Sequence, residues 1–240
     1  MTTEPLFRDD ATLRTCTATV LAAGHDGIVL DRTVFYPQGG GQPGDTGRLV
    51  LADATEIAVT DTVKGEGGAI LHRVGPDAAL PSPGTVVTAE LDWDRRFRLM
   101  RAHTAMHLLC SLIPGAAVTG GAIGDGKGRL DFDLPEAPDK EKLNAALAAL
   151  VAEDHPITTR WITEEELDAN PGLVRTLSVK PPRGAGRVRL VQIGPDAAPV
   201  DLQPCGGTHV ASTALVGRVS VAKVENKGRQ NRRIALVFEG

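Results

Sequence analysis

The sequence changes its pattern near Asp92. Before this point, short runs rich in Val, Ile and Thr are separated by Gly, Asp or Pro, which is typical of β-strands joined by turns. Because the runs recur at regular spacing and show no sustained helical period, they predict a small β-barrel. The predicted strands cover residues 15–21, 27–31, 47–51, 55–62, 69–74 and 86–91.

After Asp92 the pattern predicts a mixture of helices and strands. Residues 93–113 contain no Gly or Pro, so we expect a helix of about five turns there. We therefore predict an α+β protein, with a β-barrel domain over residues 1–92 and an α+β domain with a central helix over residues 93–240. Further helices are predicted at residues 138–153 and 164–169, and strands at 129–134, 157–162, 188–193, 217–224 and 233–238.

Composition limits the class of protein. Hydrophobic residues make up 42% of the 240 residues and aromatic residues only 3%, which indicates a folded chain with an aliphatic core. No apolar run reaches the length of about 18 residues that predicts a membrane span. The first ten residues are charged rather than apolar, so we expect a cytoplasmic protein without a secretory signal. Cys16, Cys110 and Cys205 are too scattered for a disulfide framework, but they allow metal or thiol chemistry.

Basic residues are grouped, although the net charge is −4. A local basic surface can attract a polyanion even when the whole chain is acidic. Solvated faces without a partner are the alternative. The three clusters are Arg95, Arg96, Arg98 and Arg101; Lys180, Arg183, Arg187 and Arg189; and Lys223, Lys227, Arg229, Arg232 and Arg233.

Two pairs of potential metal ligands stand far apart in the chain. His103 and His107 are four residues apart in the predicted helix, so both imidazoles would point the same way. Cys205 and His209 enclose two glycines, which let the backbone turn so that thiolate and imidazole converge. Together they form the tetrahedral set that zinc prefers, and the spacing predicts one zinc ion per chain. A nucleophilic Cys205 with a histidine partner and a purely structural cluster are the alternatives.

Two other motifs argue against common enzyme classes. Thr104 stands where the zinc proteases carry the glutamate that acts as general base, which argues against peptide hydrolysis. The glycine-rich segment of residues 35–47 lacks the patterns of a P-loop and of a dinucleotide-binding turn, so we expect neither ATP nor a dinucleotide. Its three consecutive glycines suggest a close approach of the backbone to another strand or to a substrate.

Three motifs together resemble the editing region of alanyl-tRNA synthetase, and even more its freestanding relatives, the AlaX editing proteins of medium length. They are the segment of residues 33–47, His-Thr-Ala-Met-His-Leu-Leu at 103–109, and Cys-Gly-Gly-Thr-His-Val at 205–210. The resemblance covers nearly the whole chain. It implies a translation-factor-like β-barrel followed by an α+β editing domain, in agreement with the predicted fold.

The resemblance also implies an activity. The family removes the amino acid from mischarged tRNA(Ala), which is Ser-tRNA(Ala) and in some members Gly-tRNA(Ala). It implies that zinc is bound by His103, His107, Cys205 and His209, and that Thr33 recognises the serine hydroxyl. The sequence identifies no general base. Two alternatives are a non-catalytic zinc module that binds tRNA or a synthetase, and a zinc hydrolase that acts on a different ester.

Overall fold

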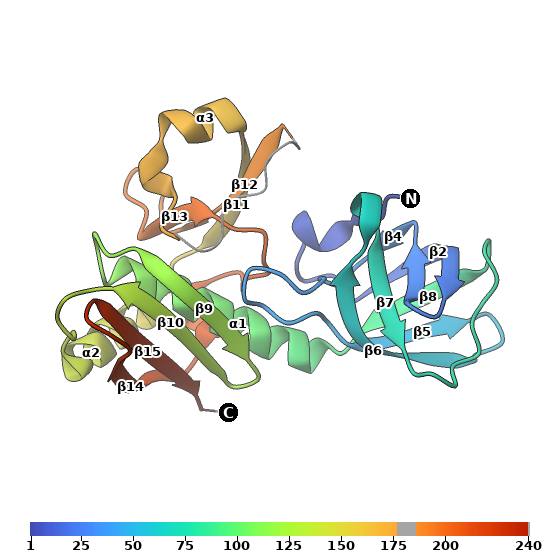
Figure 1. Cartoon of the computed structure of the whole chain (residues 1–240), viewed down its shortest axis with the longest axis horizontal. Coiled ribbons are helices and arrows are strands. Elements are labelled where there is room, and N and C mark those ends of the chain that lie inside the picture. The colour runs from blue at the N-terminus through green and yellow to red at the C-terminus, as the bar shows by residue number, and fades with distance from the viewer. Residues whose placement is uncertain (177–185, 240) are drawn as a thin grey trace. The chain divides into compact units, whose positions relative to one another are not determined.

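The computed structural model describes residues 1–176 and 186–239 (Figure 1). It divides into two compact units, Met1–Arg98 and Leu99–Gly240. Helix α1, Trp93–Ser111, begins in the first unit and ends in the second. The domain boundary after residue 92 stays a prediction. No helix within the described residues is both long enough and apolar enough to cross a membrane.

Six antiparallel strands of the first unit close into the predicted barrel (Figure 1). Inward-facing residues alternate along the strands, as Ala18 and Val20 of β2 and Val87 and Ala89 of β8 show, and all four are buried. A short parallel pair, β1 (Glu4–Pro5) and β4 (Arg32–Thr33), lies outside the barrel sheet. The strand order around the barrel is β2 (Thr15–Gly24), β3 (Gly27–Leu30), β7 (Ile70–Val74), β6 (Glu56–Lys64), β5 (Gly47–Leu51) and β8 (Val86–Leu91).

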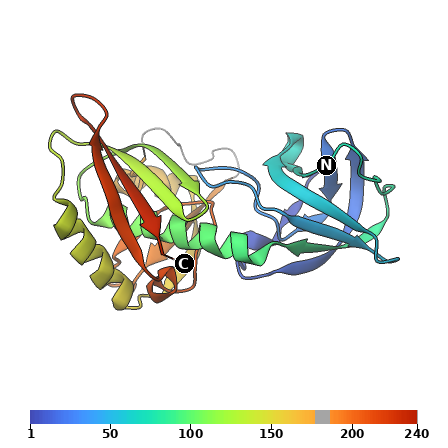
Figure 2. The ribbon, with the colours of Figure 1, turned by 90° about the horizontal axis from the view of Figure 1, so that it is seen from below.

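The second unit contains two sheets and the helices of the predicted α+β domain (Figure 2). The four-stranded sheet has the order β14 (Val219–Asn226), β15 (Asn231–Phe238), β10 (Lys127–Asp133) and β9 (Val118–Gly124). The three-stranded sheet has the order β11 (Ile157–Thr163), β12 (Arg187–Ile193) and β13 (Asp201–Pro204). The remaining helices are α2 (Lys140–Ala152) and α3 (Glu164–Ala169), with short 3-10 turns at Leu6–Arg8, Glu66–Gly68, Pro171–Leu173 and Thr213–Val216.

The sequence missed β9 and β13. β9 contains three glycines, which lower the strand propensity of the segment. The glycines have a packing role, because a Cβ on Gly121 of β9 would lie 3.0 Å from the side chain of Leu130 and 3.4 Å from that of Met106 on α1. A Cβ on Gly128 of β10 would lie 3.1 Å from the sulfur of Met106. The small residues therefore let α1 lie close against this sheet.

The glycine-rich segment approaches a strand of the barrel. A Cβ on Gly44 would lie 2.0 Å from the backbone oxygen of Thr62 in β6, so only glycine fits there. The close backbone approach is therefore at Gly44 and not within the three consecutive glycines, since a Cβ on Gly40 would meet nothing within 4 Å. The hydroxyl of Thr62 donates to the backbone oxygen of Asp45 at 2.8 Å and holds the segment in place.

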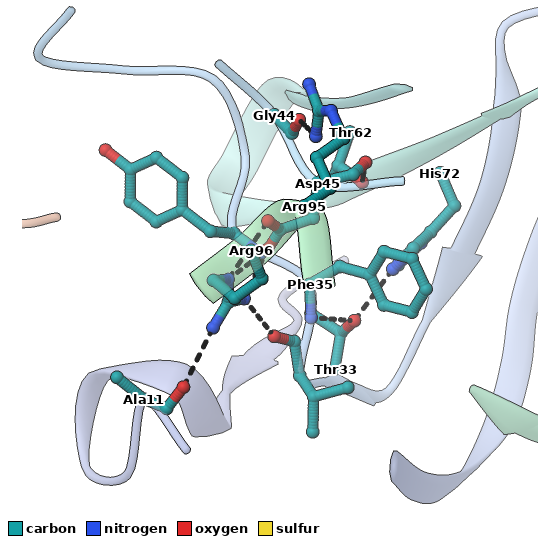
Figure 3. Close-up of polar contacts among 11 residues, drawn as sticks. Ala11, Thr33, Phe35, Gly44, Asp45, Thr62, His72, Arg95 and Arg96 are labelled. Atoms are coloured by element: carbon teal, nitrogen blue, oxygen red, sulfur yellow. Dashed lines mark hydrogen bonds and ion pairs between the residues drawn. The ribbon is translucent and has the colours of Figure 1, made fainter. Parts of the chain in front are cut away.

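The segment also carries one half of a buried ion pair (Figure 3). Arg96 of α1 is 0% exposed and Asp45 is 1% exposed. The Nε atom of Arg96 lies 3.0 and 2.9 Å from the two carboxylate oxygens, and Nη2 completes the pair. Arg96 also donates to the backbone oxygens of Val34 at 2.7 Å and Ala11 at 3.1 Å. Arg96 thus ties the start of α1 to the segment of residues 33–47 and to Ala11.

We expect Arg96→Met to lower the free energy of unfolding by about 3–5 kcal/mol, because it leaves the carboxylate of Asp45 buried without its cation. Urea unfolding curves measure this loss. Arg48→Met is the matched control, since Arg48 pairs with Glu90 at 2.7 Å on the surface and its removal should change the curve little. Equal losses in the two variants would contradict a structural role for the buried pair.

Candidate metal centre

Four side chains from two separate segments converge in the second unit. Helix α1 carries His103 and His107, one turn apart on the same face. Cys205 follows the end of β13, and His209 lies just before the 3-10 turn at Thr213–Val216. The three imidazoles are buried and Cys205 is partly buried. All four potential ligand atoms lie within 4.8 Å of one another, so the cluster could hold a metal ion.

The spacing within the cluster fits a tetrahedral ion. The sulfur of Cys205 lies 3.5 Å from Nε2 of His103 and 3.4 Å from Nε2 of His209. Typical zinc–nitrogen and zinc–sulfur bonds place neighbouring ligand atoms of a tetrahedron roughly 3.3–3.6 Å apart. The imidazole centroids are separated by 4.3 to 5.3 Å. The donor types and their distances therefore fit one zinc ion.

Hydrogen bonds to the far side of two rings determine which nitrogen faces the cluster. Nδ1 of His107 lies 2.7 Å from a carboxylate oxygen of Asp201, and the amide of Gln203 donates to the same oxygen at 2.8 Å. Nδ1 of His209 lies 3.2 Å from the hydroxyl of Thr104. These contacts leave Nε2 of both rings to bind metal, in the arrangement that orients most metal-binding histidines.

The backbone around Cys205 is fixed by a buried arginine. Nη1 of Arg189 in β12 donates to the backbone oxygens of Cys205 and Gly207, both at 3.0 Å. The N–H of Gly207 points at the sulfur of Cys205 at 3.4 Å. The two glycines of the motif thus form a turn whose carbonyl oxygens point toward Arg189 and whose amide supports the thiolate.

The side chains alone favour a thiolate at Cys205. Burial raises the pKa of a thiol, but the electrostatic interactions with His103 and His209 outweigh it and hold the pKa of Cys205 well below its usual value. Burial, with His103 adding to it, lowers the pKa of His209 to about 3. For His107 burial is outweighed by the hydrogen bonds to Asp201 and Cys205, which raise its pKa to about 10. Metal binding must therefore displace a proton from His107.

Sequence reasoning missed Asp201, Gln203 and Arg189. A signal for the first two was present, because Asp201, Gln203 and Cys205 alternate along the chain and alternate residues of a strand share one face. Arg189 was interpreted as a member of a basic surface cluster, whereas it is buried. Cys110, which lies three residues after His107, is buried, and burial raises the pKa of its thiol to about 12.

Two sequence families match parts of the chain. The family described as class II (A) tRNA synthetases matches residues 10–95, and the second additional domain of threonyl and alanyl tRNA synthetases matches residues 188–235. The alanyl-tRNA editing protein AlaX-M of Methanosarcina acetivorans is 37% identical over 97% of each chain. AlaX-M of Saccharolobus solfataricus is 33% identical over 97% of each chain. The chain belongs to the AlaX-M family of alanyl-tRNA editing proteins.

Part of a larger enzyme is also similar in sequence to this chain. The alanine–tRNA ligase of Pyrobaculum calidifontis is 37% identical over 93% of this chain, and the match covers 25% of the ligase. The matched part therefore contains both the barrel and the elements that carry the four clustered side chains.

Thr33 lies in the first unit, and its hydroxyl has partners. Thr33 is fully buried, and its oxygen lies 2.7 Å from Nε2 of His72 (Figure 3). The N–H of Phe35 donates to the same oxygen at 3.1 Å. The sequence revealed no partner for His72, because Thr33 and His72 are brought together only by the pairing of strands.

Several members of the three basic clusters are buried rather than part of a local basic surface. Arg96, Arg189 and Arg232 are buried, and each donates to backbone oxygens of the protein itself. Arg96 and Arg189 therefore cannot line a surface path for tRNA. Lys180 and Arg183 lie outside the described residues. The described members that are exposed are Arg187, Lys223, Lys227 and Arg229.

Asp201→Asn should weaken zinc binding by about 10–100-fold, because it removes the charge that orients and polarises His107. Competition with a chromogenic chelator measures the affinity. Asp133→Asn, on an exposed position of β10, is the control and should bind zinc like the wild type. An unchanged affinity in Asp201→Asn would show that the contact to His107 does not support a metal site.

Proposed function

We propose that the protein edits alanyl-tRNA by hydrolysing the ester of mischarged Ser-tRNA(Ala), with one zinc ion bound by His103, His107, Cys205 and His209. The observation that carries the proposal is the convergence of these four side chains in a chain that belongs to the AlaX-M family. Gly-tRNA(Ala) is a second substrate of the proposed site. The reaction consumes water and needs neither ATP nor a dinucleotide, and we place it in the cytoplasm.

The need for such an enzyme follows from the limits of recognition in a synthetase. A pocket that accepts alanine rejects serine only by about a hundredfold, because serine adds nothing more than a hydroxyl. A second site that hydrogen-bonds this hydroxyl discriminates in the opposite direction, since alanine would leave buried polar groups of that site unpaired. Hydrolysis at the second site then removes the mischarged serine and leaves alanine in place.

The residues around the cluster have separate tasks in this proposal. Asp201 and Thr104 orient His107 and His209 through their Nδ1 atoms, and Arg189 shapes the turn that presents Cys205. Zinc, when bound, supplies a positive charge that can polarise the ester carbonyl or anchor the 3′ end of the tRNA. Thr33 supplies the recognition of the serine hydroxyl, as the family resemblance implies.

A second candidate function is a non-catalytic zinc module that binds tRNA or a synthetase. The observation in its favour is the number of protein ligands. Four ligands fill a tetrahedral zinc ion, which is the pattern of structural sites, whereas catalytic sites keep one position for water or substrate. The two functions predict different results for the pure protein: an editing enzyme releases serine from Ser-tRNA(Ala), whereas a binding module does not.

We expect the zinc-loaded protein to release serine from Ser-tRNA(Ala) faster than alanine from Ala-tRNA(Ala). Cys205→Ala should lose zinc and serine release together, because it removes the only sulfur ligand of the proposed site. Elemental analysis and a deacylation assay measure the two quantities. Cys16→Ala, in β2 of the barrel, is the control and should keep both.

Two results would count against the proposal. Full zinc content in Cys205→Ala would exclude the assigned ligand set. A wild-type protein that holds one zinc ion and leaves the ester of Ser-tRNA(Ala) intact would favour the binding module.

A further inference from the structure

Thr33 and His72 form a pair whose hydrogen-bond directions can be derived from their neighbours. Nδ1 of His72 lies 3.0 Å from the backbone oxygen of Ile28. A carbonyl oxygen only accepts, so Nδ1 must carry a proton and donate. Burial lowers the pKa of His72 to about 4, so its ring is neutral near pH 7 and carries one proton. Nε2 of His72 is therefore unprotonated and can only accept a hydrogen bond.

The unprotonated Nε2 of His72 determines the direction of the hydrogen bond that it forms with the hydroxyl of Thr33. The oxygen of Thr33 lies 2.7 Å from Nε2 of His72, so its O–H donates to that nitrogen. The N–H of Phe35 donates to the oxygen of Thr33 at 3.1 Å and occupies one of its two lone pairs. Thr33 has no further proton to donate. One lone pair of the Thr33 oxygen remains, and it can accept one further hydrogen bond.

The surrounding fold holds the ring of His72 in this orientation. Ile28 of β3 and His72 of β7 are paired opposite each other in the barrel. A Cβ on Gly27 would lie 2.6 Å from the backbone oxygen of His72, so the glycine permits this close approach of the two strands. The ring of Phe35 packs edge to face against His72 with 5.2 Å between the centroids. Thr33 and His72 are both fully buried.

We infer that His72 is a positioning residue for selectivity, which makes Thr33 a hydrogen-bond acceptor for the hydroxyl of serine. This inference rests on the proposed function. A serine hydroxyl can donate to the remaining lone pair of Thr33, whereas alanine and glycine have no such donor. Because Thr33 is buried in the structure, contact with serine requires the chain around it to move aside when the amino acid enters.

The test compares two substitutions of His72 that differ in one property. His72→Gln can present a side-chain oxygen that accepts from Thr33, whereas His72→Leu removes the acceptor and frees the O–H of Thr33 to turn. We expect His72→Leu to lower the ratio of serine release from Ser-tRNA(Ala) to glycine release from Gly-tRNA(Ala) by roughly tenfold, the effect of one misdirected hydrogen bond. His72→Gln should keep most of the wild-type ratio. Thr33→Val should lower the ratio as His72→Leu does.

Two further measurements separate positioning from a structural role. Melting curves and zinc content are recorded for all variants, because a structural role would make the ratio follow the loss of stability rather than the presence of an acceptor. Nitrogen-15 NMR of the wild-type protein, with His72 assigned from the His72→Gln spectrum, should show a protonated Nδ1 and a bare Nε2.

The outcomes distinguish the two proposals. If the wild type does not release serine, the proposed function fails, and the inference fails with it. If the wild type releases serine but His72→Leu and Thr33→Val keep its ratio, the proposed function stands and the Thr33–His72 pair is structural only. A proton on Nε2 of His72 would overturn the assigned directions.

Discussion

Three imidazoles and a thiol are crowded together in the second unit, and the elements around them are arranged to keep them there. Polar groups that are buried together cost free energy unless each has a partner, and one ion would give all four ligand atoms the same partner. The helical spacing of His103 and His107 and the turn between Cys205 and His209 each supply half of the set. Asp201 and Arg189 then orient those halves from the strands β13 and β12.

The arginines of this chain show why counting charges predicts partners poorly. In the first unit, Arg96 forms an ion pair with a buried carboxylate and donates hydrogen bonds to backbone oxygens. In the second unit, Arg189 donates hydrogen bonds to backbone oxygens. Guanidinium groups suit such positions because they donate in several fixed directions. The proposed interaction with tRNA therefore rests on membership of the AlaX-M family and on the exposed basic residues, rather than on the clusters seen in the sequence.

The sequence predicted what depends on local patterns. The barrel strands, the helix over most of residues 93–113 and the grouping of the four potential ligands all follow from periodicity and short motifs. What it could not predict depends on pairing across the fold. β9 was missed because its glycines lower the strand propensity, and the space that Gly121 leaves for Leu130 and Met106 is evident only in the folded chain. The contact of His72 with Thr33 likewise depends on the pairing of β3 with β7.

The proposed function depends on one zinc ion bound by three imidazole nitrogens and the sulfur of Cys205. The most direct test is the zinc K-edge X-ray absorption spectrum of the purified protein, which counts neighbouring atoms by type and distance. We expect one sulfur at about 2.3 Å and three nitrogens at about 2.0–2.1 Å from the zinc ion. A protein without bound zinc, or a spectrum without sulfur at bonding distance, would contradict this ligand set.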